Sequence, residues 1–204
     1  MYYVVGGIVL VGVALFFFYS GSAPITNYPS KGATVVAFGD SLVEGVGATE
    51  ERGFVTLLSQ KLTAEKGSGI INLGMAGDTT ESALMRIETV LVADPKVVIV
   101  LVGGNDYLRR IPKETTRKNL ATIIEKIQSR GAVVVLLGVR GGILKDNFSD
   151  MYESLSEEYG TAYVSDVLEG LIGKKGFMSD EIHPSDAGYA RIAERVYPVL
   201  LEVF

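Results

Sequence analysis

The stretch Thr34-Val35-Val36-Ala37-Phe38-Gly39-Asp40-Ser41-Leu42 passes from mostly β-branched apolar residues directly into a short polar turn. A continuous apolar run of this length predicts a strand that is buried on both faces of a parallel sheet. The Gly-Asp-Ser turn is an ordinary way to leave such a strand and alone implies no function. It does place Ser41 at the carboxyl end of a strand, where open α/β sheets bind their ligands.

Apolar runs alternate along the chain with segments whose apolar residues recur at helical spacing. Four further runs predict strands, at residues 69–73, 97–102, 132–137 and 161–165. Apolar residues at helical spacing predict helices between and after the strands, around residues 54–62, 84–91, 120–127, 149–159 and 190–200. This alternation predicts a three-layer α/β/α sandwich around a five-stranded parallel sheet.

Local signals predict where some of these helices begin and end. Asp78 and Glu81, three residues apart, predict a capping box at the start of the second helix. Gly131 stands where the third helix needs a C-terminal cap. Pro198 predicts a kink or an end in the last helix.

Polar motifs cluster on one rim of the predicted sheet. Ser41, residues 74–78 and residues 103–106 follow the first three strands, and Asp180 with His183 precede the last helix. Each motif alone is an ordinary turn. Four of them in order on the same rim indicate a shared site at the carboxyl ends of the strands.

His183 is the only histidine in the chain, so a serine hydrolase built from this sequence has one possible imidazole base. A serine hydroxyl needs such a base to take its proton, and the base needs a carboxylate to fix its tautomer. Ser41, His183 and Asp180 supply the three groups, and one tight turn can join Asp180 to His183. The chain has no Gly-x-Ser-x-Gly elbow, which argues against the α/β-hydrolase fold.

Composition limits the alternatives. The chain has 204 residues, 48% of them apolar, which suits one domain with an ordinary core. A net charge of −5 excludes a basic nucleic-acid binder. The absence of cysteine excludes disulfides and thiolate sites, and a single histidine makes a transition-metal site unexpected.

Residues 2–19 carry no Asp, Glu, Lys or Arg and are about as long as a membrane span. We predict that residues 1–19 form a retained transmembrane anchor, with a cleaved signal peptide as the alternative, because no basic residue precedes the apolar run. A buried core helix is a third, weaker interpretation. Residues 20–30 are predicted to be a linker and residues 31–204 the catalytic domain. The expected location is membrane-anchored with the domain outside the cytoplasm, or secreted or periplasmic after cleavage.

From Thr34 to Leu200 the chain resembles the SGNH hydrolases, also called GDSL-type esterases and lipases. Four blocks carry the resemblance: Gly39-Asp40-Ser41-Leu42, Asn72-Leu73-Gly74-Met75-Ala76-Gly77-Asp78-Thr79, Gly103-Gly104-Asn105-Asp106 and Asp180-Glu181-Ile182-His183-Pro184. Within that superfamily it is most similar to the bacterial thioesterase, lysophospholipase and arylesterase branch, where a leucine and an arginine likewise follow the third block, as in Tyr107-Leu108-Arg109. The resemblance implies a flavodoxin-like fold and ester hydrolysis without a cofactor.

Carried onto this chain, the resemblance implies Ser41 as nucleophile and His183 as base, oriented by Asp180. It also implies an oxyanion hole made by the backbone N–H groups of Ser41 and Gly77 and the side-chain amide of Asn105.

Two positions in these blocks bear on the oxyanion hole and on substrate charge. Gly77 is preferred over Gly74 as the oxyanion donor, because the glycine directly before Asp-Thr is the family's donor position. Gly74 is expected to relax the exit from the strand. The chain departs from the commonest form of the last block by carrying Glu181 where a glycine is frequent. This extra carboxylate is expected to disfavour anionic substrates.

Three functions are compatible with these residues. The first is an acyl-ester or thioester hydrolase, the second a carbohydrate O-deacetylase on the same scaffold, and the third an inactive membrane-tethered binding module or a nucleotide binder. The first is favoured because apolar residues stand in loops near the expected site: Met75, Leu108, Ile143 and Ile182. The expected partners are a small-molecule or lipid ester and, through the N-terminal helix, a membrane, with no nucleic acid and no metal. The oligomeric state does not follow from the sequence.

Overall fold

The computed structural model describes residues 24–139 and 148–204. The apolar segment at residues 1–19 and the predicted substrate contact Ile143 lie outside these ranges. Among the helices of residues 24–139 and 148–204, none combines the length and the apolar character needed to cross a bilayer.

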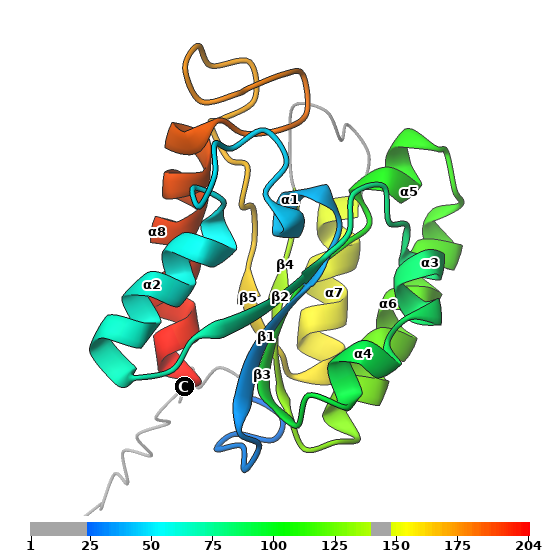
Figure 1. The fold of residues 1–204 in the computed structure, drawn as a ribbon. Coiled ribbons are helices and arrows are strands. Elements are labelled where there is room, and N and C mark those ends of the chain that lie inside the picture. The colour runs from blue at the N-terminus through cyan, green and yellow to red at the C-terminus, as the bar shows by residue number, and fades with distance from the viewer. Residues whose placement is uncertain (1–23, 140–147) are drawn as a thin grey trace, which may run out of the picture.

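Five strands form one parallel sheet in the order β2-β1-β3-β4-β5 (Figure 1). They are β1 (Thr34–Gly39), β2 (Ile70–Gly74), β3 (Pro95–Leu101), β4 (Val133–Leu137) and β5 (Ala162–Val164). The last four begin and end within two residues of the ranges predicted from the sequence, and β1 covers the apolar run that starts at Thr34. Strands β1, β3 and β4 are buried almost throughout, as their continuous apolar runs indicated. This order is that of flavodoxin-like folds, whose ligands bind beyond the carboxyl ends of β1 and β3.

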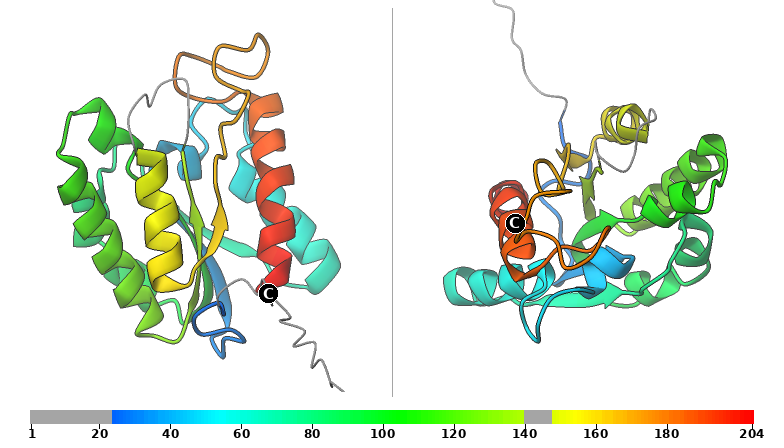
Figure 2. Two further views of the ribbon diagram at one scale, coloured as in Figure 1. Left: turned by 180° about the vertical axis from the view of Figure 1, so that it is seen from behind. Right: turned by 90° about the horizontal axis from the view of Figure 1, so that it is seen from above.

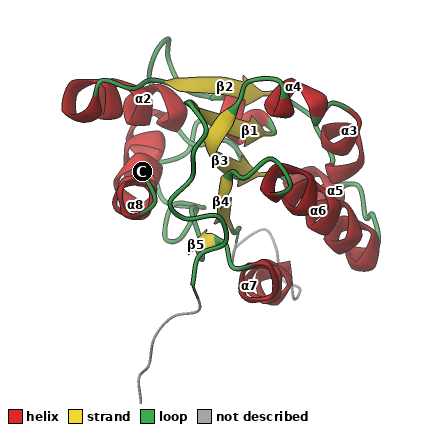
Figure 3. Cartoon of the chain, turned by 90° about the horizontal axis from the view of Figure 1, so that it is seen from below, coloured by secondary structure: helices red, strands yellow, loops and turns green. Residues whose placement is uncertain are grey.

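Helices cover both faces of the sheet, which confirms the predicted three-layer sandwich (Figure 2 and Figure 3). On one face, α2 (Phe54–Lys66) packs against α8 (Asp186–Glu202). The other face carries α3 (Thr80–Met85), α4 (Glu88–Leu91), α5 (Gly104–Leu108), α6 (Lys113–Gln128) and α7 (Phe148–Tyr159). Helix α1 (Ser41–Glu44) is a single turn that begins at the carboxyl end of β1.

The second predicted helix is divided into α3 and α4 at Arg86, and its capping box is not the predicted one. Thr79 is the N-cap, and the box joins Thr79 to Ser82 instead of Asp78 to Glu81. The Asp78 carboxylate is engaged elsewhere, because it accepts hydrogen bonds from Ser82 Oγ at 2.8 Å and Arg86 Nε at 2.6 Å. The predicted capping box was therefore wrong by one position. The Asp78 side chain binds Ser82 and Arg86, and Thr79 caps the helix in its place.

The last helix does not end at Pro198, so that alternative was wrong. Helix α8 continues through the proline to Glu202. A proline inside a helix removes one N–H donor and crowds the preceding turn. The buried side chains of Val196, Tyr197 and Leu200 hold the helix against the sheet on both sides of this position.

Residues 24–30, at the end of the predicted linker, are bound to the loops that precede β4 and β5. Thr26 Oγ1 donates to the Tyr159 carbonyl oxygen at 2.8 Å. Asn27 Nδ2 donates to the carbonyl oxygens of Gln128 and Ala132 at 2.8 and 3.0 Å. This part of the chain therefore packs on the domain, at the rim opposite the carboxyl ends of the strands.

Candidate active site

Ser41 is the first residue of α1, and the turn before it explains why the strand can end so abruptly. A Cβ atom at Gly39 would collide with the Leu101 carbonyl of β3, so only glycine allows β1 and β3 to stay this close. Asp40 is the N-cap of α1, and its Oδ1 accepts a hydrogen bond from the Leu42 N–H at 3.0 Å. The turn thus presents Ser41 at the centre of the carboxyl rim.

His183 lies in a tight loop that precedes α8. The Ser179 N–H donates to the His183 carbonyl oxygen at 2.8 Å, and Met178 forms an isolated bridge with Pro184. Asp180 Oδ1 accepts from the N–H groups of Ile182 and His183 at 2.8 and 2.7 Å. One carboxylate therefore both closes the loop and lies beside the imidazole ring.

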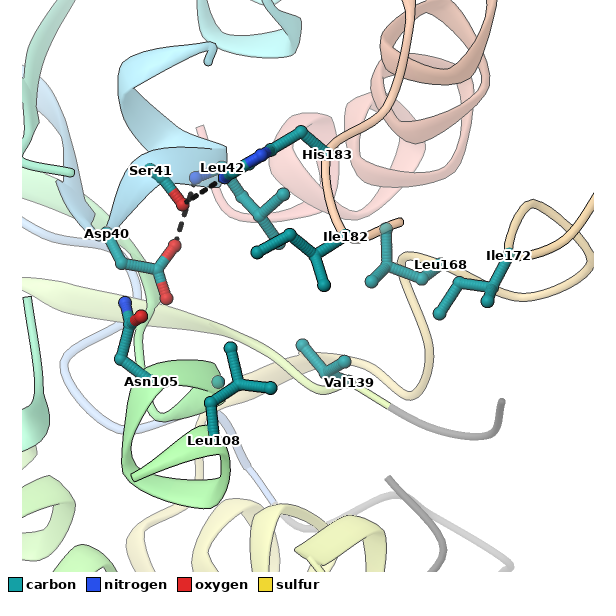
Figure 4. Close-up of a pocket in the computed structure, with 11 residues that line it drawn as sticks. Asp40, Ser41, Leu42, Asn105, Leu108, Val139, Leu168, Ile172, Ile182 and His183 are labelled. Carbon is teal, nitrogen blue, oxygen red and sulfur yellow. Dashed lines mark hydrogen bonds between the residues drawn. The ribbon is translucent and has the colours of Figure 1, made fainter. Parts of the chain in front are cut away.

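The structure brings together the three residues that the sequence proposed as nucleophile, base and acid. Figure 4 shows Ser41 and His183 facing each other. Asp180 Oδ2 lies 2.7 Å from His183 Nδ1, and His183 Nε2 lies 3.1 Å from Ser41 Oγ. The hydrogen bond with His183 and the backbone N–H of Ile182 lower the pKa of Asp180 to about 2. The carboxylate is consequently ionised at neutral pH and holds the imidazole in line with the serine.

Asn105 and Gly77 lie on the same rim. Asn105 is in α5, directly beyond β3, and its Nδ2 donates to the Asp78 carbonyl oxygen at 2.9 Å. The amide has two N–H groups, so this bond leaves one for another acceptor. Within the described ranges, the backbone N–H groups of Ser41 and Gly77 donate to no protein acceptor.

Gly77 is held in place by its neighbours. Its φ of +83° lies in the left-handed region that favours glycine. Arg109 donates to the Gly77 carbonyl oxygen at 2.9 Å, and the N–H of Ala76 donates to the Glu44 carboxylate. By contrast, a Cβ atom at Gly74 would collide with the backbone of Glu44, so Gly74 is required for the close passage between β2 and α1.

Two buried carboxylates near the rim were given no role from the sequence. Asp106 accepts hydrogen bonds from the Thr80 N–H at 2.8 Å and from Thr116 Oγ1 at 3.1 Å, and so joins α5 to α3 and α6. Asp40 is 4% exposed, and its burial raises the pKa of the carboxyl to about 7. Both belong to the motif blocks at the ends of β1 and β3, which was the available signal that they would lie near the site.

A cleft opens beside Ser41 and is lined mainly by apolar side chains (Figure 4). Of the predicted contact residues, Leu108 and Ile182 line it. Met75 does not: its N–H is bonded to the Gly39 carbonyl oxygen, and its side chain is 52% exposed outside the cleft. The apolar lining residues that the sequence analysis missed are Leu42, Val139, Leu168 and Ile172.

These missed residues carried a partial signal. Val139 follows β4, and Leu168 and Ile172 follow β5, so all three come after the carboxyl ends of strands on the rim where the site was expected. In the part of the chain that the structure describes, no group of three or more His, Asp or Glu side chains is arranged to hold a metal ion.

Comparison with known proteins agrees with this geometry. Residues 37–191 match the GDSL-like Lipase/Acylhydrolase family. The chain is 34% identical over 176 residues to Esterase TesA of Pseudomonas aeruginosa, covering 82% of this chain and 87% of that protein. It is 31% identical over 202 residues to an arylesterase of Vibrio mimicus, covering 95% and 98% of the two chains.

Solved structures show the same similarity. A crystal structure of TesA has a TM-score of 0.77 and 33% identity, covering 84% of this chain and 100% of that one. The esterase EstA from a Pseudoalteromonas species, solved in a form inhibited by monoethylphosphonate, has a TM-score of 0.72 and 27% identity, covering 83% and 97%. The chain therefore belongs to the GDSL-like Lipase/Acylhydrolase family and is an esterase of the SGNH type.

Proposed function

We propose that this esterase cleaves acyl or aryl esters and thioesters through an acyl-enzyme on Ser41. The observation that carries the proposal is the hydrogen-bonded series from Asp180 through His183 to Ser41 at the edge of an apolar cleft. A serine that faces an imidazole, itself fixed by a carboxylate, is the arrangement that activates a hydroxyl for attack on a carbonyl.

In the acylation step, Ser41 Oγ forms a bond to the carbonyl carbon while its proton passes to His183 Nε2. The tetrahedral intermediate then collapses: the bond to the leaving oxygen or sulfur breaks, and His183 returns its proton to that atom. In deacylation, water attacks the acyl-enzyme and gives a proton to His183, and collapse of the second intermediate releases the acid and restores Ser41. Asp180 stays ionised throughout and balances the charge of the imidazolium.

The negative charge that develops on the carbonyl oxygen needs donors fixed before the reaction begins. The N–H groups of Ser41 and Gly77 and the second N–H of Asn105 Nδ2 are proposed for this role. The first two have no acceptor within the described ranges, and Asn105 is already oriented by its bond to the Asp78 carbonyl. Donors oriented in this way need no rearrangement in the transition state.

The apolar lining of the cleft favours an acyl chain or an aryl group over a polar sugar. Leu42, Leu168 and Ile172 offer no hydrogen-bonding groups to sugar hydroxyls, which would lose their bonds to water on entering. This argues against the carbohydrate O-deacetylase, and an inactive module would not need an aligned Ser41 and His183. The substrate class is therefore proposed to be apolar esters of small molecules or lipids.

A panel of substrates tests the assignment. We expect p-nitrophenyl esters with acyl chains of intermediate length to give the highest kcat/KM, with acyl-CoA hydrolysed more slowly and acetylated sugars not at all. The Ser41→Ala variant is assayed on the same plate to exclude a contaminating esterase. Faster hydrolysis of acetylated xylose oligomers than of any p-nitrophenyl ester would replace the proposal with the deacetylase.

Residues 1–19 are proposed to anchor the protein in a membrane, on the strength of the uncharged run from Tyr2 to Tyr19. Full-length protein should then remain with membranes after a carbonate wash, and a chain beginning near Ser30 should be soluble and active. Recovery of mature protein that begins near Pro24 would instead show that the segment is a cleaved signal peptide.

A further inference from the structure

Arg86, between α3 and α4, binds three separate parts of the rim with one guanidinium group. Its Nε donates to Asp78 Oδ2 at 2.6 Å. One terminal nitrogen donates to the Leu73 carbonyl oxygen and the other to the Gly39 carbonyl oxygen, each at 2.9 Å. The guanidinium also lies over the ring of Phe38, 4.3 Å from its centroid.

Two of the three acceptors, Gly39 and Asp78, lie next to parts of the proposed catalytic machinery. Gly39 is the last residue of β1, two positions before Ser41. Asp78 follows Gly77 directly, and its own carbonyl oxygen accepts the hydrogen bond from Asn105 Nδ2. The Asp78 residue therefore connects Arg86 to both Gly77 and Asn105, while Gly39 connects Arg86 to the turn that carries Ser41.

The burial of this group shows that the contacts are built into the fold. The side chains of Arg86 and Asp78 are only 17% and 5% exposed. A charge is removed from water at low cost only when it is paired and its hydrogen bonds are satisfied, and here the pair and the two carbonyls meet that need. A lysine could not replace it, because an ammonium group is a point charge without the planar fork that reaches three acceptors at fixed angles.

We infer that Arg86 is a positioning residue that holds the oxyanion donors Gly77 and Asn105 in register with Ser41. The inference rests on the proposed function, because it assumes that these groups stabilise a tetrahedral intermediate on Ser41. Arg86 does not touch the substrate: it lines no part of the cleft and acts through Asp78 and the Gly39 carbonyl.

The test compares Arg86→Lys with Asn27→Ala. Asn27 is a matched control, since its side chain also donates to two backbone carbonyls, but at the opposite rim of the sheet. Both variants should melt at a lower temperature. Arg86→Lys should also lower kcat by about 10²-fold with KM changed less than about twofold, because a displacement of about 1 Å at a reacting centre has an effect of this size. Asn27→Ala should keep the wild-type kcat.

Inhibition by an alkyl boronic acid provides a second measurement, which a loss of stability alone would not change. It adds to Ser41 Oγ and forms a tetrahedral anion, which uses the oxyanion donors as the transition state does. Its inhibition constant should rise in Arg86→Lys in proportion to the loss of kcat/KM and stay constant in Asn27→Ala. If Arg86→Lys gives no folded protein, Asp78→Asn is used, because it keeps the backbone donors and removes the charge that holds Arg86.

The outcomes separate this inference from the proposed function. Wild-type kcat and boronate affinity in a folded Arg86→Lys or Asp78→Asn variant, beside an inactive Ser41→Ala, would overturn the inference alone. Activity that persists in Ser41→Ala would overturn the proposed function. If kcat falls in proportion to the melting temperature, and by the same proportion in Arg86→Lys and Asn27→Ala, Arg86 has only a structural role and the inference is wrong.

Discussion

Gly47 lies so close to His183 that a Cβ atom at position 47 would come within 2.9 Å of the His183 Cβ atom. It would also come within 2.8 Å of the Pro184 carbonyl oxygen. The loop that carries Gly47 is fixed to α8 from both sides: Tyr189 Oη donates to the Val46 carbonyl oxygen at 2.7 Å, and Thr49 is bonded to the Asp186 carboxylate. The loop after α1 therefore packs directly against the loop that carries His183.

Gly47→Ala should lower both stability and kcat. The φ of +92° at this position disfavours any side chain, and the added methyl group must push the His183 loop away from Ser41. Gly67→Ala is the control, because Gly67 has a φ of +70° but open space around its Cβ position. Both variants should have a lower melting temperature than the wild type, but only Gly47→Ala should lower kcat, by about 10-fold or more. Equal kcat in the two variants would show that the contact with His183 has no catalytic consequence.

Asn105→Ala should lower kcat by about 10²- to 10³-fold with KM little changed, as the loss of one oxyanion donor typically does. Asn105→Asp should be worse, because it places a negative charge beside the developing oxyanion. The measurement is kcat together with a melting temperature for each variant. A lower melting temperature with near-normal kcat would make Asn105 a residue of the turn alone.

Asp40→Asn should stabilise the protein more at pH 8 than at pH 4. Burial raises the pKa of Asp40 from its ordinary value of 3.8 to about 7, so the folded state holds this proton more tightly than the unfolded state. Below pH 3.8 the carboxyl is protonated in both states, so its ionisation does not lower the free energy of unfolding. The loss of stability grows as the pH rises from 3.8 toward 7 and reaches its full size above that pH. The difference in melting temperature between variant and wild type, followed across this range, should widen with pH. A constant difference would contradict the raised pKa.

Ile172→Trp should shift the preferred ester toward shorter acyl chains, since a larger side chain fills part of the apolar cleft. Met75→Trp is the matched control, because Met75 is exposed and lies outside the cleft. The ratio of kcat/KM for octanoyl and butyryl esters of p-nitrophenol should fall in the first variant and stay constant in the second. A fall in both, or in Met75→Trp alone, would place the acyl chain elsewhere.

The strands and the approach of Ser41 to His183 could be predicted because they depend on strong, simple patterns. Continuous apolar runs such as residues 97–102 indicate buried parallel strands without any tertiary information. The parallel order then brings together groups at the carboxyl ends of strands, even when they are 142 positions apart, as Ser41 and His183 are.

The role of Arg86 and most of the cleft lining could not be predicted, because they depend on tertiary contacts. In the sequence, Arg86 cannot be told from an arginine on the solvent-exposed face of a helix. Only the folded structure shows that its guanidinium donates to Asp78. Met75, after β2, and Leu108, at the end of α5, are both apolar residues on the same rim, but only Leu108 lines the cleft. The direction of a loop side chain follows from backbone bonds such as the one between Met75 and Gly39.

The most direct test of the central claim is the covalent reaction of Ser41 with a fluorophosphonate, read by intact mass and by mapping of the labelled peptide. Only an activated serine reacts readily with such a probe. We predict one adduct on Ser41 in the wild type, none in a folded Ser41→Ala variant, and strongly slowed labelling in His183→Ala. An adduct on a different residue, or labelling that persists at the wild-type rate in Ser41→Ala, would contradict the account.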